Sequence, residues 1–260
     1  MTTLPVSARR SEEEGRYRAP ALDKGLDILE LLSNQSGGMT RGEIVKAMSR
    51  SPSEIYRMLE RLVARDYVAR SPEGDRYSLT LKLFALAHRH PPVRRLVTRI
   101  LPLMDAFARE ARQSLHMVVE DRGRALVVAQ SFSPTNWEFG VRVGAILDLL
   151  GTSSGQTLLA FQGDQAREQL SIRWADTPEQ ETLGQLDPDL RAIKAQGYRI
   201  GDSRQIRGVQ DISVPILNPD GQALAVLTCP YLERLDHTDQ PSIEQTLALL
   251  REVTQDVSIK

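Results

Sequence analysis

The stretch Ser51–Asp66, SPSEIYRMLERLVARD, decides how the front of the chain folds. Ser51, Pro52 and Glu54 form a helix-opening pattern, with a capping serine, a proline in the first turn and an acid three residues after the cap. Apolar residues then recur at helical spacing and predict a buried face: Ile55, Met58, Leu59 and Leu62. The arginines fall four residues apart along another face: Arg57, Arg61 and Arg65. Such a helix suits the major groove of DNA, although a solvated surface helix would show the same row.

The residues around this helix favour the DNA-binding interpretation. A first helix is predicted from Ala21, and residues 36–38 end it. Thr40 with Glu43 is a second capping box, so a second helix precedes the arginine-bearing one in helix-turn-helix order. Two β-prone stretches then flank a turn and predict the hairpin wing of a winged helix: residues 67–70 and 76–79.

Charge is distributed unevenly along the 260 residues. Residues 1–99 carry 18 Lys and Arg against 12 Asp and Glu, and the remaining residues carry 15 against 22. The net charge of -1 therefore conceals a basic front and an acidic rear, which fits a polyanion-binding module joined to a second domain.

The sequence also limits the compartment and the chemistry. Cys229 is the single cysteine, so no internal disulfide is possible and a reducing compartment is expected. Residues 1–20 lack the apolar core of a signal peptide, and no run is long enough to cross a bilayer. The histidines show no metal-ligand spacing, so we expect no metal and no cofactor. These features predict a cytoplasmic protein without a membrane partner.

The second half of the chain changes to strand signals mixed with helices. Two hairpins are predicted, residues 115–131 around a turn at 121–123 and residues 212–228 around Asn218–Gly221. Helical patterns lie between and after them, at residues 152–162, 165–172, 190–196 and 240–257. Antiparallel hairpins mixed with helices indicate an α+β domain.

Breaks in these patterns predict the domain boundaries. Residues 1–20 are expected to be a flexible tail and residues 21–90 a winged helix-turn-helix domain. The run ending at Pro92 breaks the pattern, and residues 91–113 are predicted to be a linker helix that Pro102 kinks or divides. Residues 114–260 then form the α+β domain.

From about residue 21 onward, the chain resembles the IclR-type bacterial transcriptional regulators. Three stretches carry the resemblance: Ser53–Leu62 with Asp66–Val68, Thr152–Ala160, and Gly208–Ile216 with Leu227–Pro230. The resemblance implies a winged helix that binds operator DNA, a GAF-like domain that binds a small metabolite, and a homodimer or homotetramer. The chain departs from the family pattern near the implied pocket, at Leu150, Gln156, Asp211 and Cys229, so the ligand does not carry over with the fold.

These considerations give two sets of expected contact residues. Operator DNA is expected to meet the two helix starts, the arginine face and the wing: Thr40, Arg41, Ser51, Ser53, Tyr56, Arg57, Arg61, Arg70 and Arg76. The effector, a small organic acid, is expected at a helix start and on facing strands: Thr152, Ser153, Ser154, Asp202, Asp211, Ser213 and Thr228. Strand alternation puts Asp211 and Ser213 on one face, which lines the pocket under the resemblance and would otherwise face solvent.

Two other functions remain open. Gly151–Gly155 matches G-x-S-x-G, the nucleophile elbow of serine hydrolases, and would make Ser153 the nucleophile with His237 downstream. The expected α+β pattern lacks the alternating parallel strands of that fold, so no catalytic residue is assigned. The winged helix of a ligand-sensing adaptor would bind protein instead of DNA. We therefore expect a ligand-responsive transcriptional regulator and no enzyme; the operator, the effector and the sense of regulation are not predicted.

Overall fold

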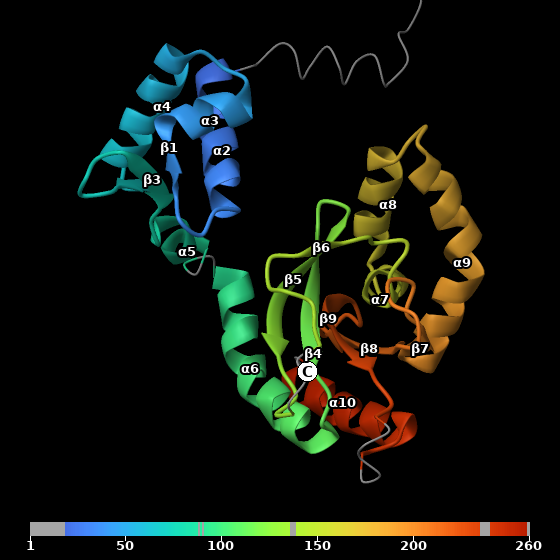
Figure 1. Ribbon diagram of the computed structural model, residues 1–260. Coiled ribbons are helices and arrows are strands. Elements are labelled where there is room, and N and C mark those ends of the chain that lie inside the picture. Colours follow the sequence, from blue (N-terminus) through green and yellow to red (C-terminus); the bar gives the residue numbers. More distant parts are fainter. Residues whose placement is uncertain (1–18, 88, 90, 136–138, 235–239, 259–260) are drawn as a thin grey trace, which may run out of the picture. The chain divides into compact units, whose positions relative to one another are not determined.

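The structure, a computed structural model, describes residues 19–87, 89, 91–135, 139–234 and 240–258. Within them the chain forms two compact units that divide between Pro91 and Pro92 (Figure 1). Each unit has its own hydrophobic core, because no core cluster of the described residues draws members from both.

The first unit is a winged helix-turn-helix. Its elements in chain order are α2 (Pro20–Ser33), β1 (Met39–Thr40), α3 (Arg41–Met48), α4 (Pro52–Ala64), β2 (Val68–Arg70), β3 (Arg76–Leu79) and α5 (Lys82–Ala87). The three strands pair antiparallel in the order β1-β3-β2, so the predicted wing hairpin is present. Its core draws one or two side chains from each main element, including Ile28, Ile44, Ile55, Leu59 and Tyr77.

Helix caps hold the two helices of the motif in place. At α3, the Thr40 hydroxyl accepts from the Glu43 N–H at 3.2 Å, and the Glu43 carboxylate accepts from the Thr40 N–H at 2.7 Å, as the capping box predicts. At α4, the Glu54 carboxylate accepts from the Ser51 N–H at 3.4 Å and from the Ser51 hydroxyl at 2.9 Å. Pro52 begins the helix, where its missing N–H costs no hydrogen bond.

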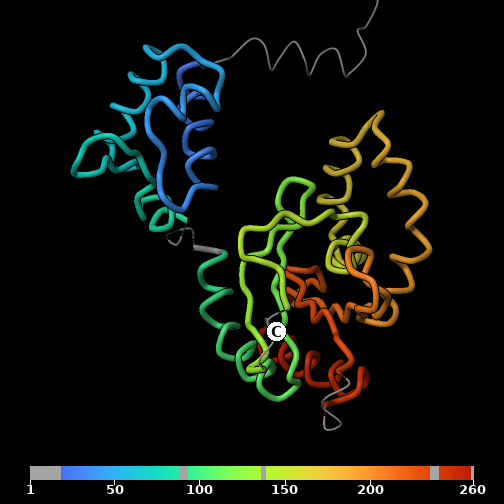
Figure 2. The backbone as a smooth tube through the Cα atoms, in the orientation of Figure 1, coloured from blue at the N-terminus to red at the C-terminus, as the bar shows by residue number. Residues whose placement is uncertain are grey.

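The second unit is an α+β domain built on one antiparallel sheet, whose path Figure 2 follows. Its elements are α6 (Pro91–Ala111), β4 (Leu115–Asp121), β5 (Arg124–Ser131), β6 (Ile146–Leu147), α7 (Ser153–Ala160), α8 (Asp164–Arg173), α9 (Pro178–Gln196), β7 (Arg199–Asp202), β8 (Gln210–Leu217), β9 (Ala223–Tyr231) and α10 (Ile243–Val257). Six strands pair in the order β6-β5-β4-β9-β8-β7. Both predicted hairpins, β4–β5 and β8–β9, lie in this sheet. Strands β6 and β7, which sequence patterns did not indicate, form its edges.

The two faces of the sheet carry different helices. One face packs against α6 and α10, and its core includes Met104, Met117, Ile212, Leu227 and Leu250. The other face packs against α7, α8 and α9, and its core includes side chains from both layers: Val118, Val226, Leu158, Leu170 and Leu190. Helix α7 is buried over its whole length, so it is the central element of this second layer.

Helix α6, expected to be a linker, is also part of the core that it forms with α10 on one face of the sheet. Its residues Ile100, Met104 and Phe107 are buried there. Pro102 lies on the exposed side of α6, which continues through it, so of the two expected outcomes, a kink or a division, the division does not occur. A proline removes one intrahelical hydrogen bond, and the packing on either side retains the helix. Among the described residues, no helix is both long enough and apolar enough to span a bilayer.

Candidate DNA-binding surface and effector site

The outer face of α4 is formed by exposed polar residues. Ile55 and Leu59 are fully buried, while Ser53, Arg57 and Arg61 are exposed on the other side of the helix. Tyr56 is 45% exposed, although its ring is large and aromatic. A helix with this division can present its polar face to a groove of DNA while its apolar face holds it to the domain.

Helix α3 contributes to the same surface. The Arg41 guanidinium lies over the Tyr56 ring, 5.7 Å from its centroid, so the start of α3 and the outer face of α4 meet. Such a cation-π contact orients an exposed arginine without burying its charge. Thr40, one residue earlier, has its hydroxyl and N–H bonded within the capping box.

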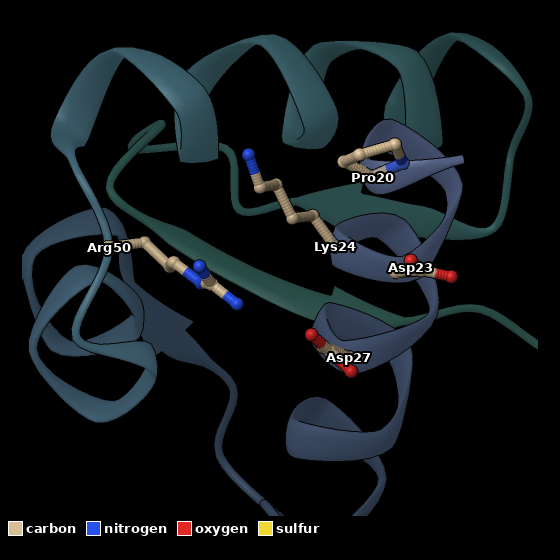
Figure 3. A pocket seen from close by; sticks show the side chains of 5 residues that line it. All are labelled: Pro20, Asp23, Lys24, Asp27 and Arg50. Carbon is tan, nitrogen blue, oxygen red and sulfur yellow. The ribbon is translucent and has the colours of Figure 1, made fainter. Parts of the chain in front are cut away.

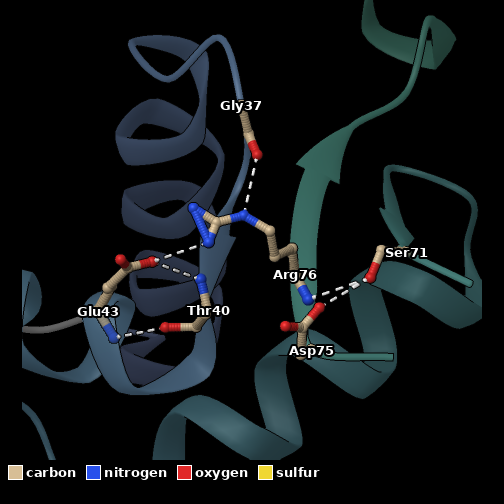
Figure 4. Close-up of polar contacts among 6 residues, drawn as sticks. All are labelled: Gly37, Thr40, Glu43, Ser71, Asp75 and Arg76. Carbon is tan, nitrogen blue, oxygen red and sulfur yellow. Dashed lines mark hydrogen bonds and ion pairs between the residues drawn. The ribbon is translucent and has the colours of Figure 1, made fainter. Parts of the chain in front are cut away.

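The two wing arginines contact the domain itself, and Figure 4 shows the contacts of Arg76. Arg76 donates to the Gly37 carbonyl at 3.2 Å, and its guanidinium lies 3.8 Å from the Glu43 carboxylate of the α3 cap. Arg70 donates to the Gly74 carbonyl at 2.6 Å across the wing turn. Both side chains therefore brace the wing, and both are exposed on its surface.

A charged surface cavity lies beside the start of α4 (Figure 3). It has a volume of about 440 Å³ and is lined by Pro20, Asp23, Lys24, Asp27 and Arg50. Lys24 donates to the Glu54 carboxylate at 2.5 Å and so joins α2 to the first turn of α4. This hydrogen bond, with those from Ser51, lowers the pKa of Glu54 to about 2. The residues expected to bind the effector all lie in the other unit.

In the second unit, one glycine lets the start of α7 lie against the turn that precedes it. A side chain at Gly155 would place its Cβ 2.2 Å from the Leu149 carbonyl oxygen, so only glycine permits this approach. Thr152 caps the helix: its hydroxyl accepts from the Gly155 N–H at 3.1 Å and donates to the Asp148 carbonyl at 2.7 Å. Ser153 and Ser154 follow in the first turn and are buried over the sheet.

Under the start of α7, polar side chains form a row across five strands. The strand register places them directly opposite one another, in the order Gln130 (β5), His116 (β4), Thr228 (β9), Ser213 (β8) and Arg199 (β7). Directly paired residues share a face of a sheet, so all five point to the side of α7. Ile212 and Val214 flank Ser213 and pack in the opposite core, which agrees with the predicted alternation.

Hydrogen bonds join most of this row to α7. The Ser153 hydroxyl accepts from the Arg199 guanidinium at 2.8 Å and from the Ser213 hydroxyl at 3.1 Å. The Thr228 hydroxyl lies 2.8 Å from Ser213 Oγ and 2.8 Å from Ser154 Oγ. The structure thus brings together Ser153, Ser154, Ser213 and Thr228, four residues expected at the effector site.

Two expected acidic residues lie toward the edge formed by β7. Asp211 pairs with Gly201 on β7 and is half-buried. Burial raises the pKa of Asp211, and a hydrogen bond with Ser203 and the charge of Arg199 oppose that rise. Burial likewise lowers the pKa of Arg199, and the Asp211 charge opposes the fall. Asp202, at the end of β7, is exposed and accepts from the Gln210 amide at 3.3 Å.

Sequence reasoning missed three members of the row. Arg199 lies on an edge strand of four residues, and its only local signal is the alternation RIGD after the helix-ending Gly197. His116 is isolated in the sequence, and nothing near Gln130 marks it as a site residue. Only the strand register places these two side by side, and no local pattern reveals it.

The structure also gives the surroundings of Ser153, the residue of the hydrolase alternative. The residues that donate to Ser153 Oγ are Arg199 and Ser213, and neither is a general base. His116 lies 3.4 Å from Ser154 Oγ, not Ser153, and His237 is outside the described residues. Within the described part of the chain, no three His, Cys, Asp or Glu side chains group to hold a metal ion.

Known proteins match both units. The IclR helix-turn-helix domain matches residues 21–72, and the C-terminal domain of the bacterial transcriptional regulator IclR matches residues 92–259. The regulator KdgR of Escherichia coli is 27% identical over 213 residues, which are 80% of each chain. The regulator BhcR of Paracoccus denitrificans is 27% identical over 224 residues, 83% of this chain and 77% of BhcR.

Solved structures share the fold. The IclR protein of Thermotoga maritima has a TM-score of 0.69 at 22% identity, over 93% of this chain and 98% of that one. An IclR homologue from Microbacterium hydrocarbonoxydans, complexed with 4-hydroxybenzoate, has a TM-score of 0.72 at 22% identity, over 92% and 97%. With a winged helix in one unit and an effector-type α+β domain in the other, the chain belongs to the IclR family of bacterial transcriptional regulators.

Proposed function

We propose that this regulator binds operator DNA through α3, α4 and the wing, and a small organic acid at the start of α7. The buried polar row that joins α7 to the sheet carries the ligand proposal. Buried polar and charged groups are costly unless they serve a structural or binding role. Such a regulator acts in the cytoplasm, where the bacterial chromosome lies.

The proposed DNA contacts follow from exposure. Ser53, Tyr56, Arg57 and Arg61 would enter or border the groove, because they form the outer face of α4. Residues at the two helix starts and in the wing would contact phosphate: Thr40, Arg41, Ser51, Arg70 and Arg76. Arg70 and Arg76 would do so while bracing the wing, since a guanidinium has five N–H donors and their hydrogen bonds to Gly74 and Gly37 use few of them.

A dimer is part of the proposal, because one winged helix reads few base pairs and two double the readout. Leu22 and Leu26 lie one turn apart on α2 and are 61% and 47% exposed. Their outward apolar side chains would be covered in a homodimer or homotetramer.

The proposed acid would place its carboxylate at the first turn of α7. The N-terminal N–H groups of a helix favour an anion, and Ser153 and Ser154 add hydroxyl groups there. Arg199 donates to Ser153 Oγ and brings a positive charge to the same point. Asp211, across from β7, would accept from a hydroxyl or amino group of the ligand. The 4-hydroxybenzoate complex of the related structure supports a small organic acid as the class to test.

A thermal-shift screen of organic acids tests the ligand proposal. Acids that bind should raise the unfolding temperature of the wild type, and Arg199→Met should abolish most of that rise because it removes the charge and the N–H donors while keeping an unbranched apolar stem. Arg191→Met is the matched control, since Arg191 is an exposed arginine on α9. An equal response in Arg199→Met and wild type would exclude Arg199 from the site. No response to any acid would contradict the proposed effector class.

A further inference from the structure

Two buried polar atoms at one end of the row have no hydrogen-bond partner among the described residues: His116 Nδ1 and Gln130 Nε2. His116 is 4% exposed, and it pairs directly with Gln130 across β4 and β5. Directly opposed side chains have their Cβ atoms about 5 Å apart, so these two side chains are neighbours on the face of the sheet under α7. Buried polar groups are nearly always hydrogen-bonded, which makes this pair a place where a partner is expected.

The hydrogen bonds among the hydroxyl groups of the row determine whether His116 Nδ1 donates or accepts. Each hydroxyl has one proton to give. Ser213 gives its proton to Ser153, so Thr228 must give its proton to Ser213. Ser154 must then donate to Thr228, which leaves Ser154 Oγ as the acceptor for His116 Nε2–H at 3.4 Å. We therefore assign the Nε2–H tautomer, in which His116 Nδ1 is an acceptor, while the Gln130 amide nitrogen is a donor.

A hydroxyl group complements this pair, because it donates one hydrogen bond and accepts others. We propose that His116 and Gln130 recognise a hydroxyl group of the effector, with the hydroxyl donating to His116 Nδ1 and accepting from Gln130 Nε2. The inference rests on the proposed binding of an organic acid at α7. It adds that the acid carries a hydroxyl group remote from its carboxylate, because His116 lies two strand spacings, or roughly 10 Å, from Ser213.

The charge state of His116 excludes a second carboxylate of the ligand at this pair. Burial lowers the pKa of His116 to about 4, so the ring is neutral near pH 7. A carboxylate offers only acceptors and would face the bare lone pair of Nδ1, whereas a hydroxyl supplies the proton that this atom needs. The pair therefore distinguishes a hydroxyl from a second carboxylate.

A glycine positions the Gln130 amide. A Cβ at Gly140 would come within 2.3 Å of Gln130 Nε2, so the backbone at Gly140 lies against this amide. The atom it would meet is the end of a flexible side chain. Gly140→Ala should therefore displace the amide at little cost in stability, and it provides a second variant that acts on recognition and not on folding.

Matched acids with and without the hydroxyl group test the inference. The probes are benzoate with 4-hydroxybenzoate, and hexanoate with 6-hydroxyhexanoate, titrated into the full-length protein by calorimetry. In the wild type, the hydroxylated member of a binding pair should have at least about tenfold higher affinity. His116→Phe keeps a flat ring without nitrogen and should reduce this ratio to within about twofold. Gly140→Ala should also lower the ratio.

Met117→Leu is the control, because Met117 neighbours His116 on β4 but packs in the opposite core; it should retain the ratio. Equal binding of both members of each pair by the wild type would overturn the hydroxyl inference and leave the acid proposal standing. A ratio that persists in both His116→Phe and Gly140→Ala would also overturn it. If none of these four acids binds but others raise the unfolding temperature in the screen, the same affinity ratio is measured for those acids with and without a hydroxyl group, and it decides the inference. If no acid binds at all, the proposed function fails first, and this inference fails with it.

Discussion

Gly155→Ala should destabilise the second unit, although glycine-to-alanine changes inside helices usually stabilise. Alanine is favoured over glycine by about 1 kcal/mol in a helix interior. Here, however, the added Cβ would lie 2.2 Å from the Leu149 carbonyl oxygen and 2.6 Å from two further backbone atoms of that residue. Overpacking costs about 1–3 kcal/mol, and a clash with backbone belongs at the upper end, so we expect a net loss of about 2 kcal/mol.

The assay is denaturant unfolding followed by tryptophan fluorescence. The first unit contains no tryptophan, since Trp137 and Trp174 both come after residue 92 in the sequence, so the signal does not report the first unit. Gly184→Ala is the matched control, because Gly184 lies in helix α9 and a Cβ added there would meet nothing within 4 Å. It should gain up to about 1 kcal/mol. A Gly155→Ala protein that is as stable as the wild type, with the same slope of unfolding free energy against denaturant concentration, would refute the close approach of α7 to Leu149.

Three further outcomes are expected. Arg61→Ala should weaken DNA binding and reduce the slope of log K against log salt by about 1; unchanged affinity and slope would remove Arg61 from the interface. Because its pKa is lower in the folded protein, Glu54 stabilises the first unit above its ordinary pKa of 4.5 and loses that effect as the pH falls toward about 2. In Glu54→Gln, the calorimetric unfolding temperature of that unit should therefore fall less steeply between these pH values. An unchanged pH dependence would argue against the Lys24 pairing. A fluorophosphonate probe should leave Ser153 unlabelled, since its hydroxyl accepts from Arg199 and Ser213; stoichiometric labelling would favour the hydrolase.

What could be predicted from the sequence was mostly local. The Thr40 cap of α3, the proline start of α4 and the hairpin turn at Asn218–Gly221 follow from residues within a few positions of one another. The structure contains each of them. Local signals of this kind were sufficient for the fold class, because helix order and hairpin order limit the architecture.

The polar row required long-range information. Arg199 and Gln130 are far apart in the sequence, and only the pairing of five strands aligns them. The roles of the wing arginines were hidden in the same way: Arg76, in strand β3, contacts Glu43, which lies in helix α3 well before it in the chain. Sequence patterns indicated exposed charge in the wing, but the partners of that charge depend on the tertiary fold.

In the proposed regulator, the binding of an organic acid and the binding of operator DNA are coupled. Thermodynamic linkage between the two binding equilibria provides the most direct test. An operator is first selected with the full-length protein, and its affinity is then measured with and without an acid that raises the unfolding temperature. If the acid changes the DNA affinity by some factor, the DNA must change the acid affinity by the same factor. We predict equal factors of about 5 to 150 in the two titrations, both abolished by Arg199→Met. Acid binding that leaves DNA affinity unchanged, or a selection that yields no operator, would contradict the claim.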